Sequence, residues 1–500
     1  MPTPTVLRSL DPASGDLVGE YEIADDAAVR SALSRAQAAA LWWSSRSPAQ
    51  RRRFLLLWKQ SLAGRARELA ALIHAETGKP LGDAGFEVML AVEHLDWAAR
   101  HAHRVLKART VSSGLLAANH RSTIEYQPLG VVGVIGPWNY PVYTPMGSIS
   151  YALAAGNAVV FKPSEYSPGV GRWLADRWAE ILPEQPVLQV VIGRGETGAA
   201  LSRAGVDKLA FTGSTATAKR VMAACAETLT PVVIEAGGKD ALIVAADADL
   251  DAAASAAVFG GLGNSGQTCV GVERVYVVDA VYDDFLARVR DRVAPLRAGI
   301  DADADYGPMT MPSQIGVIAR HIDDAIKRGG HAIVGGPDSV RPPYVDPVVL
   351  ADVPEDSSAV TEETFGPTLV VNRVVDLDDA VRRANGTAFG LAASVFSSRR
   401  QGLDVVRRLR VGSASVNAVL GFAAIPALPF GGVGDSGFGR VHGADGLREF
   451  SRPKSVTVQR FKAPLDLMTF NRKPKSVELA WKLFRFRHVR PRGRARQDVS

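Results

Sequence analysis

Cysteine is scarce in this sequence, and long apolar runs are missing. Only two of the 500 residues are cysteines, Cys225 and Cys269. Two cysteines are too few for a disulfide framework, which indicates a reducing compartment. No run reaches the roughly 18 apolar residues of a membrane-spanning helix, and the first twelve residues lack the apolar core of a secretory signal peptide. We therefore expect a cytoplasmic protein, and its length predicts two or three domains.

The positive net charge is a property of one end of the chain. The net charge is +6, and residues 472–500 contribute +8 from ten lysines and arginines and two acids, which leaves −2 for the rest. A large basic surface is what nucleic-acid binding needs. The body of the protein does not provide one, so we expect no nucleic-acid partner.

The order of predicted elements indicates an α/β fold. Helical spacing of apolar residues predicts helices over 25–43, 54–62, 68–77 and 83–106, with Ser47-Pro48 as a helix start. Short apolar strands then alternate with helices, as in parallel sheets covered on both faces. The predicted strands are 131–135, 158–162, 187–192, 208–212 and 232–235, and the helices between them are 147–155, 169–181, 196–204 and 217–229.

A second set of such elements follows residue 236. Its predicted strands are 241–244, 275–278, 332–334, 348–350, 369–374 and 394–396, and its predicted helices include 281–293 and 314–328. We read two doubly wound, Rossmann-like domains, which bind ligands beyond the carboxyl ends of their strands. Two further alternating strands, 122–127 and 455–459, lie outside both sets.

Cys269 lies in the glycine-rich stretch Gly261–Gly271. A thiol attacks carbonyl carbon well, and small neighbours let other groups approach it closely. A free cysteine is more often an inert, buried residue, so the local sequence alone leaves both interpretations open.

Two polar residues follow apolar strands and could assist a thiol. Glu235, in Glu-Ala-Gly-Gly-Lys, could activate a water molecule, or it could be a surface acid at a strand end. Asn139, in Gly-Pro-Trp-Asn-Tyr-Pro, could donate to an oxyanion, or it could be an Asx-turn residue.

Two other strand ends could hold a cofactor. Lys162-Pro-Ser-Glu165 follows one strand, and Phe211-Thr-Gly-Ser214 follows another and opens a helix. Backbone N–H groups at such a helix start could bind a pyrophosphate. The alternative is an ordinary strand–turn–helix connection with a serine cap.

The motifs occur together in the order typical of one family, and the chain resembles the aldehyde dehydrogenase superfamily from about residue 11 to about residue 462. The motifs are Pro137-Trp-Asn139, Lys162-Pro-Ser-Glu165, Phe211-Thr-Gly-Ser214, Glu235-Ala-Gly-Gly-Lys239, Gly266-Gln-Thr-Cys269, Glu363-Thr-Phe-Gly-Pro367 and Pro429-Phe-Gly-Gly432.

The resemblance implies a role for each matched residue. Cys269 matches the nucleophile, Glu235 the general base and Asn139 the oxyanion donor. It implies NAD as the cofactor, with NADP as an alternative, and no metal. A carboxylate at Glu165, placed at the ribose, would repel the 2′-phosphate of NADP. The residues expected to contact the cofactor are Ile135, Trp138, Lys162, Glu165, Gly213, Ser214, Glu363 and Phe365.

The resemblance also implies domain boundaries. Residues 1–112 and 132–236 would form the NAD-binding domain and 237–424 the catalytic domain. Residues 113–131 and 425–462 would form a protruding β-ribbon and bridging segments that pair subunits in a homodimer or tetramer, and 463–500 a basic tail.

The substrate is less well defined by the sequence. The apolar segment 417–429 is most similar to the class 3 branch, which acts on fatty and aromatic aldehydes. Phe422 and Ile425 could line a substrate funnel with Tyr140, or they could be core residues. The expected reaction is NAD(P)-dependent oxidation of an aldehyde to the acid. Alternatives are a dehydrogenase for a short semialdehyde such as succinate semialdehyde, or a catalytically silent binding protein on the same fold.

The tail has its own pattern. Residues 477–487 place apolar residues on one broad helical face, with Trp481, Phe484 and several arginines. Peripheral contact of residues 472–490 with an anionic membrane is one interpretation. Docking on a partner subunit or a disordered basic end are the others.

Overall fold

The fold is known from a computed structural model, which describes residues 5–301, 303–463, 465 and 467–489. The chain forms two compact units. The larger contains the described residues up to 106 and residues 127–452, and the smaller contains residues 107–126 and the described residues after 452.

The larger unit begins with a hairpin and four helices. The antiparallel strands β1 (Val6–Leu10) and β2 (Leu17–Glu22) form a two-stranded sheet that the sequence does not predict. The helices are α1 (Asp26–Ser44), α2 (Pro48–Gly64), α3 (Ala66–Thr77) and α4 (Leu81–Leu106). The predicted start of α2 at Ser47-Pro48 agrees with the structure, because Ser47 and Gln50 form a capping box.

The first sheet has six strands in the order β19-β9-β8-β5-β6-β7. All neighbours are parallel except the pair of β19 and β9. The strands are β5 (Val131–Ile135), β6 (Ala158–Lys162), β7 (Leu188–Val190), β8 (Lys208–Gly213), β9 (Val232–Ala236) and β19 (Gly437–Phe438). The helices connected to them are α5 (Tyr143–Ala155), α6 (Pro168–Ala179), α7 (Gly195–Arg203), α8 (Thr215–Ala226) and α15 (Gly443–Glu449).

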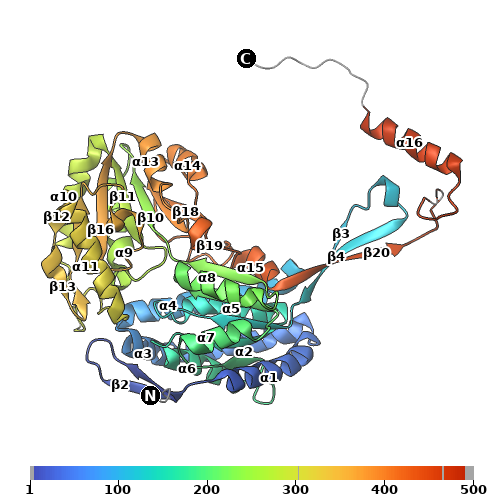
Figure 1. The fold of residues 1–500 in the computed structure, drawn as a ribbon, viewed down its shortest axis with the longest axis horizontal. Helices are drawn as coiled ribbons and strands as arrows, with labels where there is room; N and C mark the ends of the chain where they lie inside the picture. The colour runs from blue at the N-terminus through green and yellow to red at the C-terminus, as the bar shows by residue number, and fades with distance from the viewer. Residues whose placement is uncertain (1–4, 302, 464, 466, 490–500) are drawn as a thin grey trace. The chain divides into compact units, whose positions relative to one another are not determined.

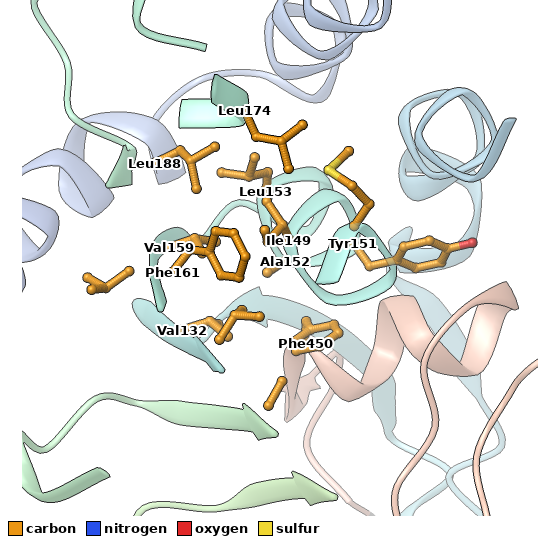
Figure 2. Close-up of a cluster of buried hydrophobic side chains, with 14 of the residues drawn as sticks. Val132, Ile149, Tyr151, Ala152, Leu153, Val159, Phe161, Leu174, Leu188 and Phe450 are labelled. Carbon is orange, nitrogen blue, oxygen red and sulfur yellow. The ribbon is translucent and has the colours of Figure 1, made fainter. Parts of the chain in front are cut away.

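The core of this domain lies between strands and helices that the apolar pattern predicts. Figure 2 shows Val132, Val159 and Phe161 of the sheet beside Ile149 and Leu153 of α5, all of them buried. At about 25 cal/mol for each Å² of apolar surface removed from water, such contacts are the main stabilising contribution.

The second sheet has seven strands in the order β12-β15-β16-β11-β10-β17-β18. All neighbours are parallel except β12 and β15. The strands are β10 (Asp240–Val244), β11 (Val272–Val278), β12 (His331–Val334), β15 (Val348–Ala351), β16 (Thr368–Val374), β17 (Ala392–Phe396) and β18 (Ser413–Val416). The helices are α9 (Leu250–Leu262), α10 (Tyr282–Val293), α11 (Pro312–Lys327), α12 (Ser358–Thr361), α13 (Leu377–Ala384) and α14 (Arg399–Arg408), and β13 (Val340–Arg341) and β14 (Tyr344–Val345) form a small hairpin.

Helices cover both faces of the second sheet. Val275 and Val277 of β11 pack in a cluster with α9 and α10, whereas Tyr276 packs in a cluster with α13 and α14. Figure 1 shows these four helices around β10 and β11. Successive side chains of a strand point to opposite faces, so a buried strand between two helix layers is apolar throughout. The predicted fold class, α/β with two doubly wound domains, is confirmed.

Helix α9 is the largest element that the sequence does not predict. Its own residues are apolar on nearly every side, so they show no helical period, although Ser255 and Phe259 are exposed, and the helix ends in the glycines of the 260–263 stretch. A helix of this kind cannot be distinguished from a glycine-rich loop by periodicity.

The two sheets present opposite ends to one region of the larger unit. In the first sheet, Ile135, Lys162, Gly213 and Glu235 stand at the carboxyl ends of parallel strands and therefore share an edge. The chain winds from β5 to β6 and β7 in one direction and to β8 and β9 in the other, so a topological switch point lies between β5 and β8. In the second sheet, Cys269 lies just before the amino end of β11.

The smaller unit contains a three-stranded sheet in the order β20-β4-β3, formed by β3 (Arg109–Val111), β4 (His120–Pro128) and β20 (Ser451–Gln459). The strands predicted at 122–127 and 455–459 are therefore neighbours. Residues 425–452, assigned from the sequence to the bridging segments, belong to the larger unit, where β19 joins the first sheet and α15 packs on α4 and α5.

The smaller unit ends in helix α16 (Pro474–His488), which has no buried residue. Leu479, Trp481, Phe484 and Phe486 are its most exposed large apolar side chains. Across the part of the chain that the structure describes, no helix is both long enough and apolar enough to cross a membrane. Residues 490–500 of the predicted tail lie outside the described residues.

Candidate active site

The turn before Cys269 is made by three consecutive left-handed residues. Asn264, Ser265 and Gly266 have φ values of 54°, 59° and 69°. A Cβ atom at Gly266 would collide with the carbonyl oxygen of Gly366, so only glycine fits there. This close approach brings the Cys269 turn against the segment that precedes β16.

Cys269 and Glu235 lie close enough to affect each other's ionisation. Burial raises the pKa of the Cys269 thiol well above its usual value, and the negative charge of Glu235 raises it further. Burial raises the pKa of Glu235 to about 7, although the Cys269 and Thr212 side chains offset part of this effect. Oε1 of Glu235 has no hydrogen-bond partner among the residues that the structure describes. A buried carboxyl group with a free oxygen and a pKa near 7 can accept and release protons at neutral pH.

The other cysteine is a core residue. Cys225 is buried in α8, its Sγ donates to the Ser202 carbonyl oxygen at 3.5 Å, and burial raises its pKa to about 11. It therefore remains a protonated, inert thiol.

Asn139 lies in the loop that follows β5. Its Nδ2 atom donates to the Gln267 carbonyl oxygen at 2.9 Å, two residues before Cys269. Its own carbonyl oxygen accepts from Lys79 Nζ at 2.8 Å and from Asn264 Nδ2 at 3.2 Å. An amide nitrogen carries two hydrogens, so the second one of Nδ2 is available to another acceptor beside the cysteine turn.

A cavity of about 380 Å³ reaches both Cys269 and Glu235. Its walls are mainly apolar and come from both domains: Phe86, Leu90, Phe259, Val419, Leu420 and Phe430. Its charged lining residues are Lys79, Asp83, Glu87 and Glu235. Lys79 is therefore the only cationic side chain among the described residues of the lining.

Of the three predicted substrate residues, one lines this cavity. Tyr140 does so, and its hydroxyl lies 3.0 Å from Thr268 Oγ1. Phe422 is not in the lining and packs on Phe430, with ring centroids 6.1 Å apart. Ile425 is also outside the lining and is 47% exposed.

The residues predicted to bind a cofactor come from both sheets of the larger unit or from the loops next to them. On the first sheet, the buried Lys162 Nζ is 3.5 Å from Glu165 Oε2, and burial lowers its pKa. Gly213 ends β8, and Ser214 caps α8 by accepting from Thr217 N. Ile135 is the buried last residue of β5.

On the second sheet, Glu363 and Phe365 lie in the turn before β16. Glu363 accepts from Gly238 N at 2.9 Å, and burial raises its pKa to about 8, with Glu273 adding to the shift. Phe365 has a φ of 49°, and its ring meets that of Trp138 edge-on with centroids 5.6 Å apart. The loop after β5 and the turn before β16 are thus in contact through these two rings.

Comparison with known proteins identifies the family. The profile of the aldehyde dehydrogenase family matches residues 2–456. The chain belongs to this family. A 4,4'-diapolycopene aldehyde oxidase of a Methylomonas species is 38% identical to this chain, over 92% of this chain and 87% of its own length. A putative succinate-semialdehyde dehydrogenase [NADP(+)] of Mycobacterium ulcerans is 35% identical, with coverages of 86% and 84%.

The solved structures give the same result. An aldehyde dehydrogenase of Mycobacterium tuberculosis in complex with NAD+ superposes with a TM-score of 0.87 at 32% identity, covering 92% of this chain and 96% of that one. This aldehyde dehydrogenase is therefore an oxidoreductase of a family that uses NAD or NADP. Its membership of the class 3 branch stays a prediction.

The side chains of this aldehyde dehydrogenase fit a nicotinamide dinucleotide. Among the described residues the buried Lys162 ammonium forms one ion pair, with Glu165 at 3.5 Å, and so retains donors for ribose hydroxyls. The start of α8 offers free N–H groups to a pyrophosphate. Glu363 retains acceptor capacity beyond its one hydrogen bond to Gly238.

The sequence does not predict two ion pairs that hold the loops of the site. Lys79 pairs with Glu87, and Lys239 pairs with Glu273. Glu273 also accepts from the backbone N–H groups of Thr364 and Phe365 at 2.8 to 3.2 Å. The sequence contains one signal for these ion pairs: Lys79 and Lys239 each directly follow a glycine at a turn.

Proposed function

We propose that this aldehyde dehydrogenase oxidises an apolar aldehyde, medium- or long-chain aliphatic or aromatic, to its carboxylic acid. The reaction would pass through a thiohemiacetal and a thioester of Cys269, and Glu235 would activate the water that hydrolyses the thioester. The observation that carries this proposal is the apolar cavity that ends at Cys269 and Glu235.

The first step of the proposed reaction needs a thiolate. Glu235 is the carboxylate with the strongest charge effect on the Cys269 thiol, and its pKa of about 7 suits it to accept the thiol proton. The sulfur then adds to the carbonyl carbon of the aldehyde. The second hydrogen of Asn139 Nδ2 and the backbone N–H of Cys269 would donate to the oxyanion, and one such donor contributes about 3 kcal/mol of barrier lowering.

The oxidation requires a hydride acceptor, and the nicotinamide of NAD or NADP supplies it when bound. Lys162, Glu165 and Ser214 on the first sheet and Glu363 and Phe365 on the second would hold the dinucleotide. Glu235 would then release the thiol proton to solvent and take a proton from water, and the hydroxide would attack the thioester carbon. The C–S bond breaks, the acid leaves, and Glu235 returns its proton to the thiolate, which restores the thiol.

The lining of the cavity favours an uncharged substrate. A short semialdehyde such as succinate semialdehyde carries a carboxylate, which would require a cation in the pocket. Lys79 is the only candidate among the described lining residues, and it already pairs with Glu87. Asp83, Glu87 and Glu235 would repel such a substrate, so we rank the apolar class above the semialdehyde alternative.

A substrate panel tests the proposal. NADH or NADPH formation is followed with hexanal, dodecanal, benzaldehyde and succinate semialdehyde, with Cys269→Ala as the inactive control. We expect kcat/KM to increase with apolar surface, because each buried methylene contributes about 0.8 kcal/mol. The highest kcat/KM for succinate semialdehyde would refute the apolar class. The same panel compares NAD with NADP, and Glu165 favours NAD because its carboxylate would repel a 2′-phosphate.

Assembly and surface contact are further parts of the proposal. The sheet of β20, β4 and β3 would pair subunits in a homodimer or tetramer, which light scattering at several concentrations measures. The exposed apolar residues and the arginines of residues 472–490 would contact an anionic membrane. Co-sedimentation with anionic vesicles compares the full chain with residues 1–470, and equal binding would exclude this contact.

A further inference from the structure

Lys79 and Glu87 form an ion pair in the interior of the larger unit. Lys79 lies between α3 and α4 and is 2% exposed, and Glu87 lies in α4 and is 1% exposed. A buried ion pair gains little stability over an apolar pair of the same size, because both charges lose their hydration. Fold stability alone is therefore a weak reason for two charges at this position.

The pair holds both ends of the segment that contains Asn139. Lys79 Nζ donates to the Asn139 carbonyl oxygen at 2.8 Å and lies 3.9 Å from the centre of the Tyr140 ring. Glu87 Oε1 accepts from Val142 N at 2.8 Å and from Tyr143 N at 3.1 Å. These two N–H groups belong to the start of α5, where a negative charge also interacts favourably with the helix dipole.

The segment between these two anchors also contacts the cysteine turn. Asn139 Nδ2 donates to the Gln267 carbonyl oxygen, and the Tyr140 hydroxyl meets Thr268 Oγ1. The position of the Asn139 amide relative to Cys269 therefore depends on a backbone whose two ends are held by Lys79 and Glu87.

We propose that Lys79 and Glu87 are positioning residues, which fix the Asn139 side-chain amide at the distance from Cys269 that oxyanion stabilisation requires. This inference rests on the proposed function, because it assigns the pair to the same oxyanion site. Oxyanion donors act by being held in place before the reaction, and a displacement of about 1 Å can cost about 10²-fold in rate. Neither residue touches the reacting atoms in this scheme.

The test is a double-mutant cycle on kcat. The variant Lys79→Met/Glu87→Gln removes both charges together, so that neither is left buried and unpaired, and the glutamine Oε1 can still accept from Val142 and Tyr143. It is measured in the wild-type background and in the Asn139→Ala background. We expect kcat to fall about 10- to 10²-fold in the first background and to fall little further in the second.

Two controls separate positioning from general damage to the fold. Lys59→Met/Asp96→Asn removes another lysine–carboxylate pair, at 2.8 Å, that also involves α4, and it should leave kcat unchanged in both backgrounds. Alkylation of Cys269 by iodoacetamide forms no oxyanion, so its rate should be the same with and without the Lys79–Glu87 pair.

The outcomes are distinct. An equal loss of kcat in both backgrounds, or a parallel loss of alkylation rate, would overturn the positioning role. If the double variant does not fold, Lys79→Gln/Glu87→Gln, which also removes both charges but keeps a hydrogen-bond donor at position 79, is carried through the same cycle with the same criterion. If the wild-type protein forms no NADH or NADPH from any aldehyde, the proposed function fails instead.

Discussion

The two sheets of the larger unit reach the candidate site from opposite ends of their strands. The first sheet contributes residues at or just after the carboxyl ends of β5, β6, β8 and β9, where the chain leaves extended backbone. The second contributes residues just before the amino ends of β11 and β16, where Asn264, Ser265, Gly266 and Phe365 adopt left-handed conformations. The first sheet therefore supplies the proposed base and oxyanion donor from strand ends and the loops that follow them. The second sheet supplies the proposed nucleophile from a turn whose close contacts require glycine and left-handed residues.

Each side also has one buried lysine–glutamate pair. Lys79 and Glu87 hold the loop after β5, which belongs to the first sheet. Lys239 and Glu273 hold the turn before β16, which belongs to the second. We expect loss of the first pair to lower kcat and loss of the second to weaken dinucleotide binding.

The largest expected effect follows the removal of Glu235, the proposed base on the first sheet. Glu235→Gln keeps the size of the side chain beside Cys269, but a glutamine cannot accept a proton. We expect kcat to fall about 10²- to 10⁴-fold, the range of general base catalysis. The Cys269 thiol can still lose its proton to solvent, because loss of the Glu235 charge removes one cause of its raised pKa, so a slower first turnover of NADH still appears as the thioester accumulates. Rapid-quench mass spectrometry measures the acylated Cys269. An unchanged steady-state rate would show that another group activates water.

The next effect concerns the turn of the second sheet. Gly266→Ala requires a left-handed alanine whose Cβ collides with the Gly366 carbonyl oxygen. Backbone strain and overpacking together should lower the free energy of unfolding by about 2 to 5 kcal/mol. Denaturant unfolding measures this loss. The matched control is Gly316→Ala in α11, where a Cβ meets nothing within 4 Å, and there we expect a small gain. Equal stabilities of the two variants would contradict the close approach.

Residues at strand ends could be predicted from the sequence, whereas contacts over long sequence distances could not. Strands such as 131–135 and 158–162 agree with β5 and β6, and Lys162 and Glu235 could be assigned because a polar residue ending an apolar run is visible in the sequence. The buried ion pairs reach their loop partners over long sequence distances. Glu273 meets Thr364 across 91 positions, and Lys79 meets Asn139 across 60. No local pattern encodes such pairs.

The residues that line the cavity could not be predicted from the sequence either. Phe422 and Ile425 were expected to line the funnel because their segment is apolar, but Phe86, Leu90 and Phe259 of α4 and α9 line the cavity instead. Phe86 and Phe259 are each more than half exposed, and an exposed aromatic residue on a helix is not distinguished by sequence from an ordinary surface residue. Only the tertiary packing of α4 and α9 shows that Phe86 and Phe259 line the cavity.

The pH dependence of turnover reports on Glu235, the proposed base in β9 of the first sheet. Burial raises the pKa of Glu235 to about 7, and only the deprotonated form is a base. We expect kcat to increase with pH, to be half-maximal near pH 7, and to fall about tenfold for each pH unit below it. Glu235→Gln should abolish this dependence. A profile that is flat from pH 6 to 8 in the wild-type protein would show that Glu235 does not limit turnover.

A smaller effect is expected from the ion pair of the second sheet. Glu273→Gln keeps the shape of the side chain but weakens the hydrogen bonds that Thr364 N and Phe365 N donate to it. The Glu363–Phe365 turn should lose order, and KM for the dinucleotide should increase about tenfold, which corresponds to about 1.4 kcal/mol of binding energy. We expect kcat at saturating cofactor to change little. A fall in kcat at unchanged KM would assign Glu273 to the chemical step and remove the contrast with Lys79 and Glu87.

The smallest expected effect returns to the first sheet. Ser214 is the N-cap of α8 and also lies where a pyrophosphate would bind. Ser214→Ala removes the cap and should cost about 1 kcal/mol of stability, measured as a small decrease in Tm. Loss of one hydroxyl donor should increase KM for the dinucleotide only a few-fold, since the backbone N–H groups of α8 remain. Ser47→Ala at the capping box of α2 is the control, because it should lower Tm by a similar amount and leave KM unchanged. Equal KM values for the two variants would show that the Ser214 hydroxyl serves the helix and does not contact the cofactor.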